Sequence, residues 1–113
     1  MSIKRITAIV PTDILKTLEK QLRECGVPGV TVEHVQGYGK HPNFFRRDLM
    51  HDNVRVVLYV QDDKVDEIVA AIARCAVEYG ARGGILAVER IDRLVSLTNG
   101  ADIAASSLCE CGE

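Results

Sequence analysis

The sequence has few aromatic residues and no marked excess of one charge. Trp is absent from the 113 residues, and Phe, Trp and Tyr together make up 4%. This scarcity argues against stacking on single-stranded nucleic acid and against an aromatic ligand cage. Fourteen Lys and Arg against sixteen Asp and Glu give a formal net charge of −2, which argues against bulk electrostatic binding of duplex nucleic acid.

Long hydrophobic runs are also missing, since charged residues interrupt every apolar stretch before the roughly 20 residues that span a bilayer. The first residues, Met1 to Arg5, lead into a strand pattern instead of the apolar core of a signal peptide. We therefore expect a cytoplasmic protein that is not embedded in a membrane.

No spacing of Ser, His, Asp or Cys assembles a nucleophile with its base, so we expect no enzymatic activity. A metal site and a tightly bound cofactor are not expected either, because one Cys-x-Cys without a second close pair is a weak zinc pattern. The side chains that could still supply soft ligands are His34, His41, His51, Cys109 and Cys111.

The four cysteines divide into two pairs. Cys25 and Cys75 fall inside helical patterns and are predicted to be small core residues. Cys109 and Cys111 lie in a polar tail, where accessible paired thiols favour a redox response. The alternative for this tail is a terminus whose cysteines have no role.

Hydrophobic periodicity predicts a β-α-β-β-α-β order. Alternating residues indicate strands at 3–10, 30–35, 53–60 and 85–88, with a further β-like stretch at 94–97, and helical spacing follows Thr12 or Asp13 and Asp62. This order is typical of the ferredoxin-like α+β sandwich, an antiparallel sheet with two helices on one face. We expect one domain at 1–100, carrying a loop at 37–53, and a C-terminal tail at 101–113.

The predicted strands have a second apolar face, which includes Ile9, Val35, Val57 and Tyr59. Two helices cover only one face of such a sheet. We therefore predict self-association into a homo-oligomer that buries the other face.

The connection 37–53 has seventeen residues, far more than a hairpin needs, and loops of this length are usually functional or disordered. Its cations indicate an anion-attracting or partner-binding role, and the alternative for its aromatic pair is packing against the core. The residues predicted to contact a partner are Phe44, Phe45, Arg46 and Arg47.

Two glycine-rich segments are candidate ligand sites. Gly37-Tyr38-Gly39-Lys40 permits close backbone approach of a ligand, or forms a simple turn. Gly80-Ala81-Arg82-Gly83-Gly84 follows a predicted helix, where its amides would cradle phosphate beside Arg82, or would form an ordinary helix C-cap. Arg93, in an alternating charged stretch, is a candidate to reach a ligand from a neighbouring subunit.

These segments resemble the PII signalling proteins. The run from Pro28 to Lys40, PGVTVEHVQGYGK, is similar to their second strand and loop entry, Gly-Met/Val-Thr-Val-x-x-Val-x-Gly-Phe-Gly-Arg. Val60-Gln61-Asp62-Asp63-Lys64-Val65-Asp66 and Gly83-Gly84-Ile85-Leu86 are similar to Val-Pro-Asp-Asp-x-Val-Asp and Gly-Lys-Ile-Phe. The resemblance covers about residues 3–99.

The resemblance implies a homotrimer that binds adenine nucleotides between subunits and reports ligand state through the long loop. It places Gly37, Tyr38, Gly39 and Lys40 at the loop base near the nucleotide, and Arg82, Gly83 and Gly84 at the phosphate-side turn. The departures lie at phosphate-binding charges: a family lysine is Gly84 here, and two arginines fall near Val95 and Leu97. Because charge-assisted contacts are strong, their loss favours ADP or AMP over ATP.

The family glutamine that helps hold magnesium and 2-oxoglutarate is His41 here. No Tyr occurs from Lys40 to Asn53, so the uridylylated tyrosine of enteric members has no equivalent. The chain thus looks more like the divergent PII-like group associated with carboxysomes or bicarbonate transporters. We expect bicarbonate near Gly39 and Lys40 as a second regulatory ligand. The target would be a transporter or a metabolic enzyme. The alternatives are a metal-responsive CutA-like trimer, a nitrogen-regulatory PII adaptor and a small nucleotide-processing enzyme.

Overall fold

The computed structural model describes residues 2–27, 29–36, 52–78 and 84–108. In these residues the order is β1 (Ile3–Pro11), α1 (Leu15–Glu24), β2 (Thr31–Gln36), β3 (Asp52–Gln61), α2 (Val65–Glu78) and β4 (Ile85–Ile91). Single 3-10 turns are η1 (Thr12–Ile14), η2 (Asp62–Lys64) and η3 (Ala105–Ser107). This is the predicted β-α-β-β-α-β order.

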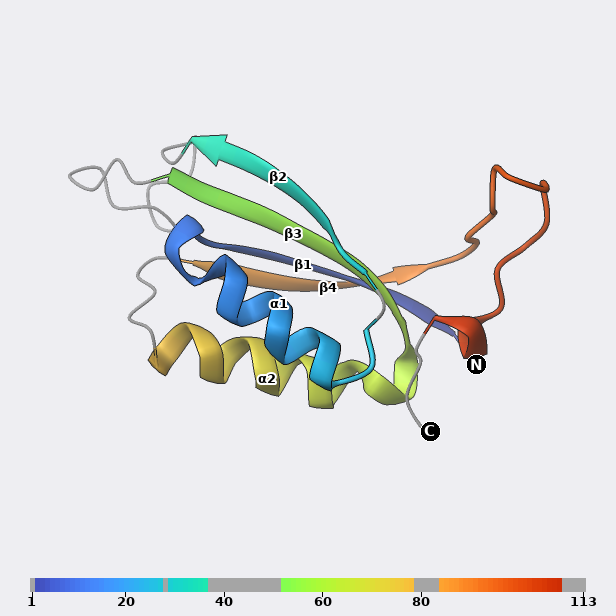
Figure 1. The fold of residues 1–113 in the computed structure, drawn as a ribbon. Helices are drawn as coiled ribbons and strands as arrows, with labels where there is room; N and C mark the ends of the chain where they lie inside the picture. Colours follow the sequence, from blue (N-terminus) through green and yellow to red (C-terminus); the bar gives the residue numbers. More distant parts are fainter. Residues whose placement is uncertain (1, 28, 37–51, 79–83, 109–113) are drawn as a thin grey trace.

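The four strands form one antiparallel sheet in the order β2-β3-β1-β4, so the first and third strands occupy its centre. Both helices lie on the same face of this sheet (Figure 1). The ferredoxin-like fold expected from the sequence is therefore confirmed.

The core lies between the sheet and the helices. Every second side chain is buried from Ile6 to Val10 on β1 and from Val54 to Val60 on β3, as expected for strands with one covered face. The cross-strand pairs Ile6 with Leu58 and Ala8 with Val56 place these side chains on the helix face. The helices complete the core with Leu18, Leu22, Ile68 and Ile72. Cys75 is 1% exposed, as predicted, whereas Cys25 is half-buried at the edge of the core.

Two local predictions are corrected. The first helix does not start from a Thr12 or Asp13 cap: β1 continues to Pro11, which occupies the N-cap position of η1 without a side-chain hydrogen bond. The stretch 94–97 is not a strand but one arm of a short hairpin with a single bridge, between Val95 and Asp102. A tight turn causes this, because Gly100 has a φ of 73° and its N–H donates to the Ser96 carbonyl at 2.8 Å.

The sheet face away from the helices, here called the open face, carries Thr7, Ile9, Val57 and Tyr59, all half-buried. Its ionic groups pair within the chain. Arg5 Nη2 lies 2.6 Å from Glu89 Oε1, and Arg55 Nη1 lies 3.3 Å from Glu33 Oε1. Because the pairs are cross-strand neighbours, they leave the apolar side chains between them available to another surface.

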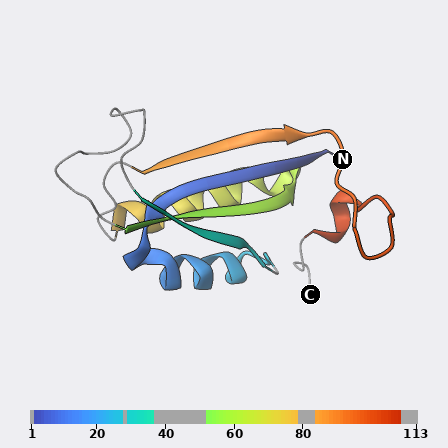
Figure 2. The same cartoon turned by 90° about the horizontal axis from the view of Figure 1, so that it is seen from above.

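Different segments meet at the two ends of the sheet (Figure 2). At one end β2 finishes and β3 begins, and Ile85 at the start of β4 pairs with Ile9. We call this the loop end, since segments 37–51 and 79–83 connect there. At the other end lie the N-terminus, the start of β2 and the C-terminal turn η3. In the described part of the chain, no helix is long and apolar enough to cross a membrane.

Candidate functional site: a cleft at the start of β2

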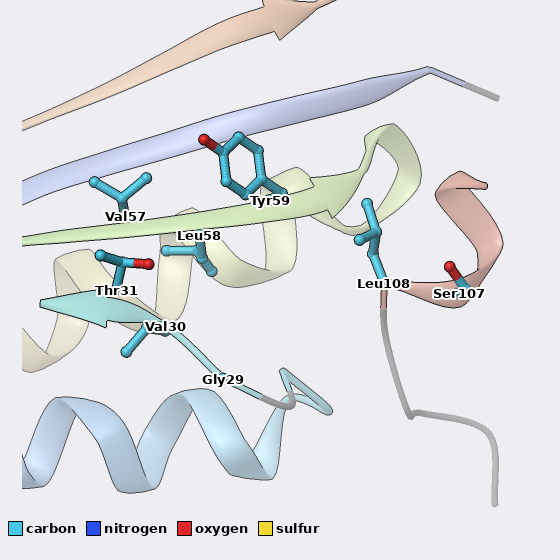
Figure 3. A pocket seen from close by; sticks show the side chains of 8 residues that line it. All are labelled: Gly29, Val30, Thr31, Val57, Leu58, Tyr59, Ser107 and Leu108. Carbon is cyan, nitrogen blue, oxygen red and sulfur yellow. The ribbon is translucent and has the colours of Figure 1, made fainter. Parts of the chain in front are cut away.

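A cleft of about 350 Å³ opens on the described surface where β2 separates from β3 (Figure 3). Its volume falls within the range typical of small-molecule sites. Two chain segments from the sheet and one from the C-terminus form its walls. The lining residues are Gly29, Val30, Thr31, Val57, Leu58, Tyr59, Ser107 and Leu108.

The cleft exists because β2 is shorter than β3. Pairing between the two strands begins at Thr31 with Val57, and Gly29 and Val30 precede it. β3 continues beyond this pair to Gln61, so its last residues have β1 as a partner on one side only among the described strands. The open strand edge forms the floor of the cleft.

Backbone geometry at this edge follows from strand alternation. The Asp62 N–H donates to the Ser2 carbonyl at 3.0 Å, which shows that the even-numbered backbone groups at this end of β3 face β1. Odd-numbered groups face the opposite side, because successive antiparallel residues alternate in direction. The N–H and C=O of Tyr59 therefore point toward the cleft as an adjacent donor and acceptor.

Side chains add mostly apolar surface. Thr31, Val57 and Tyr59 stand on the open face, whereas Leu58 is 2% exposed and packs into the core on the other face. The C-terminal turn brings Leu108 to the cleft. None of the eight lining residues carries a charge. Such a cleft is suited to an uncharged, flat ring whose edge offers hydrogen-bond donors and acceptors.

One lining residue, Tyr59, belongs to a cross-strand row that also contains an ion pair. Arg5 pairs in register with both Tyr59 and Glu89, and its Nε lies 2.9 Å from Glu89 Oε1. Hydrogen bonding to Glu89 first and to Tyr59 second raises the pKa of Arg5. The ion pair with Glu89 thus lies in the same cross-strand row as Tyr59.

Few of the residues predicted from the sequence can be located. Most of the predicted site residues lie outside the described residues, namely Gly37, Tyr38, Gly39, Lys40, Phe44, Phe45, Arg46, Arg47, Arg82, Gly83, Cys109 and Cys111. Those that the structure describes are Gly84 and Arg93.

Gly84 has a structural role that requires no ligand. A Cβ at this position would lie 2.6 Å from the carbonyl oxygen of Ile9, closer than packing permits. The glycine lets the chain enter β4 against the end of β1. Arg93 lies on the exposed hairpin, where its Nε contacts Asp102 Oδ1 at 2.9 Å. It is not among the residues that line the cleft.

Sequence reasoning missed the cleft. The sequence predicts Val30 and Thr31 only as the start of a strand, although the Pro28-Gly29 step before them signals late entry into the sheet. Nothing in the sequence pattern indicates that Ser107 and Leu108 approach Tyr59, because the contact joins segments far apart in the chain. No group of three or more His, Cys, Asp or Glu in the described ranges could hold a metal ion.

Comparisons with known proteins agree with this architecture. A family model described as "Nitrogen regulatory protein P-II" matches residues 3–98. The fold and the family model together define a PII-type protein. The chain belongs to the nitrogen regulatory protein P-II family. Its resemblance to this family, noted from the sequence, is confirmed.

Individual relatives are distant. The chain is 31% identical over 104 residues to Nitrogen regulatory protein P-II 1 of Escherichia coli (strain K12), covering 86% of this chain and 93% of the relative. It is 26% identical over 110 residues to Nitrogen regulatory protein GlnK of the same strain, covering 90% and 98%. A crystal structure of Arabidopsis thaliana PII bound to citrate superposes with a TM-score of 0.76 at 20% identity, covering 99% of this chain and 94% of that one.

Proposed function

We propose that this regulatory protein is a non-enzymatic sensor that binds an adenine nucleotide between the subunits of a homotrimer. The observation that carries the proposal is the uncharged cleft beside the edge of β3 that no described strand covers. The Tyr59 backbone offers one donor and one acceptor side by side, the pattern that the edge of an adenine ring complements. Val57 and Leu108 supply apolar surface for its faces.

The distance between the two ends of β2 explains why more than one subunit is needed. The cleft lies at the start of β2, whereas the predicted phosphate-binding residues follow its end, roughly 16 Å away along the strand. A base bound in the cleft would place its phosphates beside the loop end of a neighbouring subunit. The open face, with its ion pairs satisfied within the chain, is the surface through which such neighbours would associate.

The preference for ADP or AMP over ATP is proposed from the charges available. Lys40 and Arg82 remain as candidate phosphate ligands. Gly84 replaces a charged residue of the family, and Arg93 makes an ion pair with Asp102. Fewer cations reduce the advantage of each additional phosphate.

Bicarbonate is the proposed second ligand, held by the backbone at Gly39 and by Lys40 beside the nucleotide. An anion that helps order the loop over the nucleotide must itself bind better when nucleotide is present. Loop 37–53, with Phe44, Phe45, Arg46 and Arg47, would report this state to a transporter or a metabolic enzyme of inorganic-carbon metabolism in the cytoplasm. Cys109 and Cys111 remain the proposed redox-responsive pair.

The decisive test is calorimetric titration of the purified protein with ADP, AMP and ATP, each with and without bicarbonate at fixed pH and ionic strength. We expect saturable binding of ADP or AMP that is tighter than binding of ATP and is strengthened by bicarbonate. Light scattering should give three copies per particle, and incubation with ATP should release no phosphate. Absence of any nucleotide binding would contradict the proposal, whereas binding that ignores bicarbonate would remove only the carbon-linked part.

A further inference from the structure

The chain's own C-terminal segment forms one wall of the cleft. After β4 the chain runs through the 94–103 hairpin, and η3 then contacts β3 at the cleft end of the sheet. Ala105 anchors this turn with only 8% of its surface exposed, and the Leu108 N–H donates to the Ala105 carbonyl at 3.2 Å. Leu108 is therefore held at the cleft by a docked turn.

Two leucines in this region have opposite surroundings. Leu97, at the tip of the hairpin, is 97% exposed and is not among the residues that line the cleft. Leu108 is half-buried and stands opposite the end of β3 (Figure 3). A half-buried leucine at the rim of an uncharged cleft retains apolar surface that a bound ring would cover.

We propose that Leu108 contacts the base of the bound nucleotide and sets the affinity of the cleft for it. This inference rests on the proposed nucleotide site and adds a determinant from the same subunit. The floor of the cleft, the Tyr59 backbone, reads the edge of the base, while Leu108 covers one of its faces. Base recognition is thus completed by a segment about fifty residues further along the chain.

Coupling between the turn and the ligand follows from this geometry. A base that packs against Leu108 stabilises the docked position of η3, so the ligand and the turn order each other. Because η3 is a single short turn outside the sheet ladder, the segment should open more easily than the strands when the cleft is empty. Ligand binding should suppress this opening.

The test compares Leu108→Ala with Leu97→Ala, a matched loss of the same side chain outside the cleft. By calorimetry with ADP, we expect Leu108→Ala to weaken binding about tenfold, since it removes several apolar groups from the contact. The heat-capacity change on ADP binding should become less negative, because less apolar surface is buried. Leu97→Ala should match the unsubstituted protein, and Leu108→Met, which conserves volume, should restore most of the affinity.

Hydrogen exchange gives a second measurement that does not depend on a substitution. Amides of 105–108 should exchange more slowly when ADP is present, whereas those of the Leu97 turn should not change. The inference would be overturned if Leu108→Ala and the unsubstituted protein had equal ADP affinity and equal heat-capacity change, and if ADP did not protect 105–108. The proposed function would then remain intact. Failure of the unsubstituted protein to bind ADP would overturn both.

Discussion

The two faces of one sheet differ sharply in this molecule. On the helix face, Ile6, Val56 and Val60 have no exposed surface. On the open face, their neighbours Thr7, Val57 and Tyr59 are half-buried and alternate with cross-strand ion pairs. The same strands therefore carry the core on one side and a half-buried, partly apolar surface on the other.

This difference separates folding from assembly. The helix face is completed by the chain's own helices, so its packing determines the stability of the single chain. The open face is half apolar and internally charge-balanced, and its apolar part becomes favourable only when another surface covers it. Substitutions on the two faces should therefore affect different measurements.

The largest loss of stability is expected from Ile6→Ala on the helix face. Ile6 is completely buried between β3 and β4, and its truncation leaves a cavity at the centre of the sheet. The free energy of unfolding should fall by about 3 kcal/mol, measured by urea denaturation. Thr7→Ala on the other face is the control and should cost under about 1 kcal/mol. Similar losses for both variants would show that the faces are equally packed.

Ile9→Glu tests the open face. Ile9 lies on the open face near its loop end, where it pairs with Arg55 and Ile85. A carboxylate there would have to be buried in the proposed trimer, and we expect it to weaken association by at least about 2 kcal/mol. Light scattering should show smaller particles, while circular dichroism keeps the same secondary structure. A persistent trimer would place the subunit interface elsewhere.

Arg5→Met should have a smaller effect, because it removes an ion pair in which Arg5 is 38% and Glu89 is 50% exposed. Pairs of this kind contribute about 0 to 1 kcal/mol, so thermal stability of the single chain should change little. Binding should respond more, since Arg5 pairs in register with Tyr59, whose backbone lines the proposed site. Titration with ADP checks this, and a large drop in melting temperature without change in binding would contradict it.

The smallest effect is expected just beyond the start of β1 and the end of β3, where the Ser2 hydroxyl donates to Asp62 Oδ2 at 2.7 Å. This hydrogen bond lowers the pKa of Asp62 below its ordinary value of 3.8. A lowered pKa gives stability that is present above pH 3.8 and is lost as the pH falls through the folded-state value. Ser2→Ala should therefore raise the pKa of Asp62, as followed by NMR titration, and reduce the loss of stability in acid. An unchanged titration would show that Ser2 does not stabilise the carboxylate.

Much of the fold follows from local patterns. Alternation in 53–60 and helical spacing after Asp62 are properties of short segments, and they identified the strands and helices because one buried face requires them. The same alternation predicts Ile9 and Val57 on the second face, where the structure has them. The alternation at 94–97 indicates a β-like stretch, which forms only the bridge of Val95 with Asp102 in a hairpin that turns at Gly100.

The cleft is a different kind of feature. It depends on where β2 leaves β3, and on the position of Leu108 after the chain has crossed the end of the sheet. Neither is a periodic property. The family resemblance predicts nucleotide-binding residues in the glycine-rich segments at the loop end, whereas the described cleft lies at the opposite end of β2.

The sequence by itself determined the order of elements, the burial of Cys75 and the presence of two apolar sheet faces, because side-chain periodicity encodes which face of each element avoids water. Only the tertiary structure decided that no described strand pairs with Tyr59 on its cleft side and that Leu108 lines the same cleft. The physical reason is that a binding site is made by contacts between distant segments, and strand register and chain crossing set those contacts.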